Sequence, residues 1–149
     1  MADSDLIKLY SGRILELAAD IPHSGRLDAP DASVRKRSPQ CGSTVTVDLR
    51  VRDGRVKAFA QDVRACALGQ ASAAILGARV IGQDRAALSA LRDAVKAMLT
   101  AGGPVPDAPF GDYEVLLPAR EFRNRHASIL LALEATVEAI DEAARSACA

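Results

Sequence analysis

Two cysteines are the side chains of this sequence best suited to chemistry, and the pattern between them predicts that they meet. Cys41 and Cys66 flank two alternating runs, 44–52 and 55–63, which Asp53-Gly54 separates. Asp-Gly favours a two-residue turn, because both central residues must reach positive φ and Gly does so without steric cost. The sequence therefore predicts a β-hairpin with a thiol at the foot of each strand.

The turn also predicts a register. If Arg52 faces Arg55, counting outward along both strands places Cys41 opposite Cys66. Opposed residues hold their Cβ atoms about 4.5 to 5.5 Å apart, which suits two thiolates that share a metal or a cluster. A bulge would shift the pairs without separating the thiols. The expected pairs are Val51 with Val56, Leu49 with Ala58, Val47 with Ala60 and Val45 with Asp62.

The residues around the two cysteines also suit a metal or sulfur site. Cys66 precedes a predicted helix, whose first N–H groups and dipole favour a thiolate that can bind metal or accept sulfur. Gly42 leaves room beside Cys41, and the Ser43 hydroxyl can hydrogen-bond to sulfur although it is a poor metal ligand. His126 lies one turn before the apolar stripe of the last helix, so it faces inward and offers a third ligand.

Each of these residues also has a structural interpretation. Buried cysteines are often small hydrophobic residues, and a lone histidine on an apolar helix face is often a satisfied core residue. Cys148, next to the end of the sequence, is expected to have no role. Spacing alone leaves the structural and the metal-binding interpretations of Cys41 and Cys66 open.

Composition limits the function classes. The 149 residues form one expected domain, 1–149, that is 49% hydrophobic and 26% charged. The 19 basic and 19 acidic side chains cancel, and aromatic residues are 3%, which argues against nucleic acid or a membrane as the partner. An acidic start without a long apolar run predicts a cytoplasmic protein. Three cysteines in a reducing compartment favour metal or sulfur chemistry over disulfides.

The remaining patterns predict helices around the hairpin. Basic residues Arg35-Lys36-Arg37 within 26–40 indicate a loop or a solvated edge strand, with a docking patch as the alternative. The hairpin alternates between an apolar face and a polar face that carries Asp48, Phe59 and Gln61. The helices are expected from Asp3 or Ser4 to Ile21, from Cys66 to Gly77 or Gly82, from Asp84 to Gly102-Gly103, and over 124–144. Pro104, Pro106 and Pro109 predict a non-helical connector that leads to Tyr113 and to 115–118.

The cysteine motifs resemble a known family. Pro39-Gln40-Cys41-Gly42-Ser43 is similar to the Pro-x-Cys-Gly-Asp motif of the IscU/NifU/SufU-type iron-sulfur cluster assembly scaffolds. The run from Ala65 to Ala73, Ala-Cys-Ala-Leu-Gly-Gln-Ala-Ser-Ala, resembles their Gly-Cys-x-Ile-Ser-x-Ala-Ser-Ala. Leu117-Pro118-Ala119-Arg120 and the helix after His126 resemble the last third of the SufU branch, so the resemblance extends over nearly the whole chain.

The resemblance implies an α+β fold, with a three-stranded antiparallel sheet packed against about four to five helices. It implies a scaffold rather than an enzyme: the chain would receive sulfur from a cysteine desulfurase, hold iron and a nascent [2Fe-2S] cluster, and pass the cluster to apo-protein acceptors. No hydrolase triad or phosphate-binding glycine loop suggests another reaction.

Two departures from the family pattern leave alternatives open. Ser43 replaces the family's Asp, and the family's third Cys is missing. If Arg123-Asn124-Arg125-His126 is aligned with the family's Arg-x-x-Cys, His126 takes the place of that Cys. If His-Ala-Ser-Ile-Leu, which starts at His126, is aligned with the family's His-Cys-Ser-Ile-Leu, Ala127 takes its place. The preferred hypothesis is a variant scaffold with the ligands Cys41, Cys66 and His126. The alternatives are a zinc-binding sulfur-transfer partner of the desulfurase and a metal-free relative that acts as a binding module.

Overall fold

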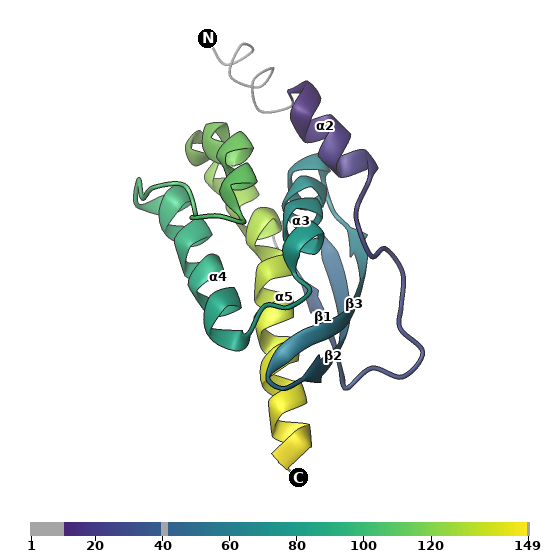
Figure 1. The fold of residues 1–149 in the computed structure, drawn as a ribbon. Coiled ribbons are helices and arrows are strands. Elements are labelled where there is room, and N and C mark those ends of the chain that lie inside the picture. Colours follow the sequence, from purple (N-terminus) through teal and green to yellow (C-terminus); the bar gives the residue numbers. More distant parts are fainter. Residues whose placement is uncertain (1–10, 40–41, 149) are drawn as a thin grey trace.

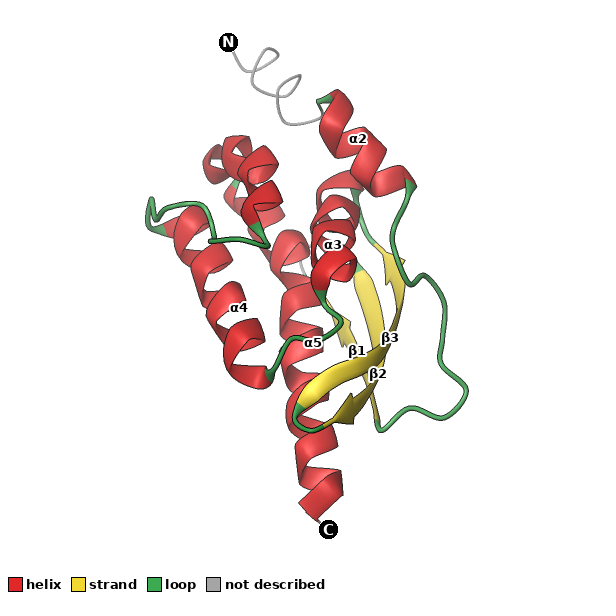
Figure 2. Ribbon diagram, viewed as in Figure 1, coloured by secondary structure: helices red, strands yellow, loops and turns green. Residues whose placement is uncertain are grey.

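The computed structural model describes residues 11–39 and 42–148 and confirms the predicted α+β class. Its three strands form one antiparallel sheet in the order β1-β2-β3. In chain order the described elements are α2 (Gly12–Ala19), β1 (Ala32–Arg37), β2 (Thr44–Arg52), β3 (Arg55–Arg64), α3 (Ala67–Arg79), α4 (Arg85–Thr100), the 3-10 helix η1 (Gly111–Glu121) and α5 (Arg123–Cys148). Figure 2 shows the sheet along one side of the helices.

The helices cover one face of the sheet in two layers. α5 packs against β1 and β2, and α4 packs against α5 on the side away from the sheet (Figure 1). α3 lies beside α5 and α2. The apolar face of β2 supplies the centre of the core, because Val45, Val47 and Leu49 are almost completely buried there. The predicted alternation of β2 thus buries one row of side chains under α5.

The predicted hairpin turn is confirmed, but the predicted register is wrong beyond the first two pairs. Asp53 and Gly54 both have positive φ, and Arg52 pairs with Arg55 as expected. A bulge lies between Arg50 and Val51, where the register shifts by one residue. The observed pairs are therefore Leu49 with Phe59, Val47 with Gln61 and Val45 with Val63.

The bulge changes which side chains are buried. Phe59 and Gln61 now lie opposite the apolar row of β2, and both are buried rather than on the polar face. The side-chain amide of Gln61 donates to the carbonyl oxygens of Pro22 and Ala73, at 3.2 and 3.0 Å. Gln61 thus joins β3 to α3 and to the segment before β1.

Asp48 was expected on a solvated face, yet its side chain is completely buried. The Arg26 guanidinium donates to both carboxylate oxygens, at 2.7 and 3.1 Å, and the Ser33 hydroxyl donates at 2.6 Å. The backbone N–H of Leu27 adds a fourth bond of 3.0 Å. The bonds from Arg26 and Leu27 hold the segment before β1 against the face of the sheet that the helices leave open, and Ser33 adds a bond from β1 itself.

Helix boundaries follow local signals. Asp84 caps α4 as predicted, because its carboxylate accepts the N–H of Ala87 at 2.8 Å. The predicted connector that starts at Pro104 leads into η1, a 3-10 helix that was not predicted from the sequence. Tyr113, Leu116 and Ala119 are all buried, and their three-residue spacing matches the period of a 3-10 helix.

The remaining predictions concern the chain ends and the first strand. The 26–40 segment contains an edge strand, β1, one of the two predicted possibilities. α5 begins one residue earlier and ends later than the expected 124–144. The expected caps Asp3 and Ser4 lie outside the described residues, and the described helix α2 is capped by Ser11. None of the described helices has the length and hydropathy needed to cross a membrane.

Candidate functional site

Cys66 occupies the junction between β3 and α3. It follows the last residues of the sheet and is the N-cap of α3, with extended backbone dihedrals of φ −67° and ψ 169°. Its side chain is partly buried and packs against the hydrophobic core. The predicted position of Cys66 at a helix N-terminus is therefore confirmed.

The turn before β2 brings Ser43 to the same place. The Ser38 N–H donates to the Ser43 carbonyl at 2.8 Å, and the Gly42 N–H donates to the Ser38 carbonyl at 2.9 Å. Gly42 has a φ of 72°, which favours glycine. Ser43 is buried, and Cys41 lies outside the described residues.

Ser128 links these two segments, although no sequence pattern pointed to it beyond its place two residues after His126. The Ser128 Oγ lies 3.2 Å from the Ser43 Oγ and 3.4 Å from the Cys66 Sγ. Its side chain is buried near the start of α5. The site therefore joins the foot of β2, the start of α3 and the start of α5.

Gly69 allows α5 to approach α3 this closely. A Cβ at this position would lie 2.6 Å from the Ser128 Oγ and 3.0 Å from the Ser128 carbonyl oxygen. One turn further along α3, the Ser72 hydroxyl donates to the Ile129 carbonyl at 2.7 Å. The buried Tyr113 hydroxyl then donates to the Ser72 carbonyl at 3.0 Å, which adds η1 to the same junction.

The surroundings of Cys66 favour its thiolate. Burial raises the pKa of the thiol, but the Ser128 hydroxyl, the backbone N–H groups of Gly69 and Leu68, and the charge of Arg125 together lower it by more. The pKa of Cys66 therefore lies below the ordinary value of a cysteine. A thiolate is the form that binds soft metal ions and attacks sulfur.

His126 faces inward as predicted. It is 8% exposed, and its Nε2 lies 2.7 Å from the carbonyl oxygen of Ala119. A carbonyl only accepts, so Nε2 carries the proton of this bond and Nδ1 of the neutral ring keeps its lone pair. Metal-binding histidines commonly use such a bond to fix the ring.

The metal site itself stays a prediction. Among residues 11–39 and 42–148, no three His, Cys, Asp or Glu side chains form a group that could hold a metal ion. Cys41, which the sequence places in the site, lies outside those ranges. The described part of the site therefore consists of Cys66 with the hydroxyls of Ser43 and Ser128, and of His126 on the same helix as Ser128.

In the metal-free chain, we expect Cys66 to become reactive at a lower pH than an ordinary cysteine does. In a Cys41→Ser, Cys148→Ser background, iodoacetamide alkylation should reach half its maximal rate below the ordinary thiol pKa of about 8.5. In denaturant the pH at half-maximal rate should return to that value, because the Ser128 hydroxyl and the α3 N–H groups no longer lie near the sulfur. Equal midpoints in the folded and unfolded chains would contradict the environment described for Cys66.

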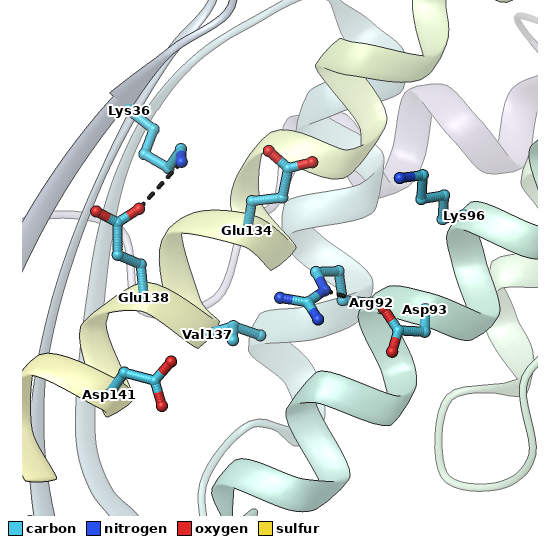
Figure 3. A pocket seen from close by; sticks show the side chains of 8 residues that line it. All are labelled: Lys36, Arg92, Asp93, Lys96, Glu134, Val137, Glu138 and Asp141. Carbon is cyan, nitrogen blue, oxygen red and sulfur yellow. Dashed lines mark hydrogen bonds and ion pairs between the residues drawn. The ribbon is translucent and has the colours of Figure 1, made fainter.

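A second polar feature, a charged hollow between β1, α4 and α5, lies outside this site. Figure 3 shows its acidic and basic side chains facing one another, with Lys36 bound to Glu138 at 3.0 Å and Arg92 bound to Asp93 at 3.1 Å. Lys36 joins β1 to α5 through Glu138, and Arg92 and Asp93 are neighbours on α4, so the hollow carries side chains of both signs. This pattern is typical of charged contacts between packed elements.

Comparisons with known proteins agree with this geometry. Residues 9–127 match the model of the NifU-like N terminal domain family. The iron-sulfur cluster assembly scaffold protein IscU of Thermotoga maritima is 33% identical over 75 residues, which are 50% of this chain and 53% of the relative. The chain thus spans about half the length of that curated relative.

Two solved structures extend the likeness over nearly the whole chain. The N-terminal part of a NifU-like protein from Brucella abortus is 42% identical, with a TM-score of 0.92, and the match covers 95% of this chain and 98% of that one. A candidate iron-sulfur cluster assembly scaffold for the SUF system of Fervidobacterium islandicum has a TM-score of 0.81 at 16% identity, covering 90% and 98%. The second likeness is one of fold.

Proposed function

Because the chain belongs to the NifU-like N-terminal domain family, we propose that it is an iron-sulfur cluster assembly scaffold that binds iron and a nascent [2Fe-2S] cluster and passes the cluster to apo-proteins. The observation that carries this proposal is the environment of Cys66, a half-buried thiol with a lowered pKa where three elements of the family fold meet. Scaffolds of this family are not enzymes, and no catalytic residue is assigned to this chain.

The proposed ligands are Cys41, Cys66 and His126. Two thiolates and one imidazole leave a fourth position for water, a small thiol or a partner's side chain. The Nε2 bond of His126 to Ala119 supports its role, since it leaves Nδ1 as the coordinating atom. Ser43 is proposed as a hydrogen-bonding group rather than a ligand, since its hydroxyl contacts Ser128, which in turn contacts Cys66.

The proposed partners are a cysteine desulfurase, which supplies sulfur, and the apo-proteins that accept the cluster. Zero net charge and few aromatic residues give no support to a nucleic-acid partner. The proposed setting is the cytoplasm, where reduced cysteines are stable.

The test is the iron, zinc and acid-labile sulfide content of protein purified without oxygen. The parent should contain iron and sulfide, and Cys41→Ser, Cys66→Ser and His126→Ala should each lose both. Cys148→Ser, which changes a thiol outside the proposed ligands, should match the parent. Circular dichroism should show that all four variants stay folded, because the described core is built mainly from aliphatic side chains.

Other outcomes separate the alternatives. Stoichiometric zinc without sulfide, lost in the same three variants, would replace the scaffold by a zinc-binding sulfur-transfer partner. An absence of metal in the parent even after reconstitution with iron and sulfide would sink the proposal and leave a metal-free binding module. Loss in the two cysteine variants but not in His126→Ala would reject the histidine ligand alone.

A further inference from the structure

The structure connects Cys66 to two buried hydroxyl groups in a row. The Ser43 Oγ lies 3.2 Å from the Ser128 Oγ, which lies 3.4 Å from the Cys66 Sγ. Ser128 and Ser43 are only 2% and 4% exposed, whereas Cys66 is partly open to solvent. The row thus begins inside the protein and ends on the reactive sulfur.

The number of hydrogens sets the direction of these bonds. A serine hydroxyl carries one hydrogen, and a thiolate carries none, so Ser128 must donate to Cys66 when the sulfur is anionic. Ser128 has then used its hydrogen, and the bond to Ser43 requires Ser43 to donate to Ser128. A hydroxyl that accepts a bond becomes a better donor, so the two bonds reinforce each other at the sulfur.

The packing of α5 on α3 holds Ser128 in place. Gly69 offers the space that the Ser128 side chain and carbonyl occupy, since a Cβ there would lie within 3.0 Å of both. The Ser72 hydroxyl fixes the next residue of α5 by its 2.7 Å bond to the Ile129 carbonyl. The donor is therefore built into the helix junction and does not depend on a mobile side chain.

We propose that Ser128 is a positioning residue that donates a hydrogen bond to the sulfur of Cys66, is itself oriented by Ser43, and so restrains the reactivity of that sulfur. This inference rests on the proposed function, in which Cys66 accepts sulfur or binds a cluster. In sulfur transfer the thiolate attacks the outer sulfur of a protein persulfide, the donor's S–S bond breaks, the donor leaves as a thiolate, and Cys66 carries the new persulfide.

The proposal gives the Ser128 hydroxyl of α5 an effect on the chemistry of Cys66. Because a hydrogen bond lowers the nucleophilicity of a thiolate, Ser128 slows unspecific attack by Cys66 on disulfides. In a loaded scaffold the same bond would raise the reduction potential of the cluster, since hydrogen bonds to ligand sulfur stabilise its negative charge.

The test uses the full-length, metal-free chain with Cys41→Ser and Cys148→Ser, so that Cys66 is the remaining thiol. Its reaction with 5,5′-dithiobis(2-nitrobenzoate) releases one coloured thiolate for each mixed disulfide formed. The rate is measured as a function of pH, and the plateau that each variant reaches at high pH, where its thiol is fully ionised, is compared. Ser128→Ala should react roughly three- to tenfold faster, and Ser128→Thr at the parent rate, because Thr keeps the hydroxyl.

Two further variants separate a positioning role from a structural one. Thr136→Ala removes another buried hydroxyl of α5, which lies about two turns beyond Ser128 and bonds to the Ala132 carbonyl, so it should leave the rate unchanged whatever it does to the thermal midpoint. Ser43→Ala should accelerate the reaction less than Ser128→Ala does. An unchanged rate in Ser128→Ala, or equal acceleration in Thr136→Ala, would overturn the proposal. Neither result depends on metal content, so failure here is distinct from failure of the scaffold function.

Discussion

Replacing Asp48 with alanine should lower the free energy of unfolding by about 2 to 3 kcal/mol, because several hydrogen bonds to a buried charge are lost together. The variant leaves the Ser33 hydroxyl and the Leu27 N–H without this partner, whereas Arg26 is exposed enough to turn to water. Urea unfolding followed by circular dichroism measures the change.

Asp62→Ala is the matched control. Like Asp48 on β2, Asp62 on β3 is an acidic residue on the face of the sheet away from the helices. Its side chain, however, is 44% exposed, and its basic partner Arg64 is 3.8 Å away. Its effect should stay within about 0.5 kcal/mol. Equal effects of the two substitutions would show that the bonds of Asp48 contribute little.

The same carboxylate predicts a pH dependence. Burial raises the pKa of Asp48, but hydrogen bonds from Arg26, Ser33 and Leu27 and the charge of Arg26 lower it by more, so its pKa in the folded chain lies below the ordinary value. This stabilisation is complete above the unfolded-state pKa of about 3.9 and is lost as the pH falls through the folded-state pKa. Asp48→Asn should lose less stability than the parent on acidification below about pH 4.

Replacing Gly69 with alanine should both destabilise the chain and disturb Cys66. The new Cβ would lie 2.6 Å from the Ser128 Oγ and 2.8 Å from the Ala65 Cβ, so α3 and α5 must separate. We expect a loss of about 1 to 3 kcal/mol, as for overpacked cores. The exchange rate of Cys66 should also rise toward that of Ser128→Ala, because the hydroxyl no longer reaches the sulfur.

Gly12→Ala is the control for a glycine-to-alanine change within a helix. A Cβ at Gly12 would meet no atom within 4 Å, so this variant should gain up to about 1 kcal/mol from helix propensity. Stability and thiol exchange are measured on both variants. A Gly69→Ala variant as stable as the parent, with an unchanged exchange rate, would contradict the close packing at this junction.

The sequence predicted those parts of the fold that local patterns determine. The Asp-Gly turn, the buried row of β2 and the cap at Asp84 follow from residues near one another in the chain. The register beyond the turn did not follow, because a bulge depends on how β3 packs against the helices. The burial of Asp48 was not predicted for a similar reason, since nothing near Asp48 in the sequence indicates that Arg26 will cover it.

In the candidate site, too, local patterns predicted some features, whereas packing between distant segments determines others. The place of Cys66 at a helix start and the inward direction of His126 could be read from helical periodicity. Ser128 could not, because its contact with Cys66 spans 62 positions and requires the fit of α5 against Gly69. Contacts between distant segments are set by packing, which no local pattern encodes.

The edge strand β1 has a consequence for assembly outside the site. An exposed edge invites a strand of another molecule to extend the sheet, and charged side chains on the edge discourage this. Three consecutive basic residues, Arg35, Lys36 and Arg37, lie on β1, so two copies aligned edge to edge would bring like charges together. Folded copies are therefore less prone to aggregate by adding strands to the sheet at β1.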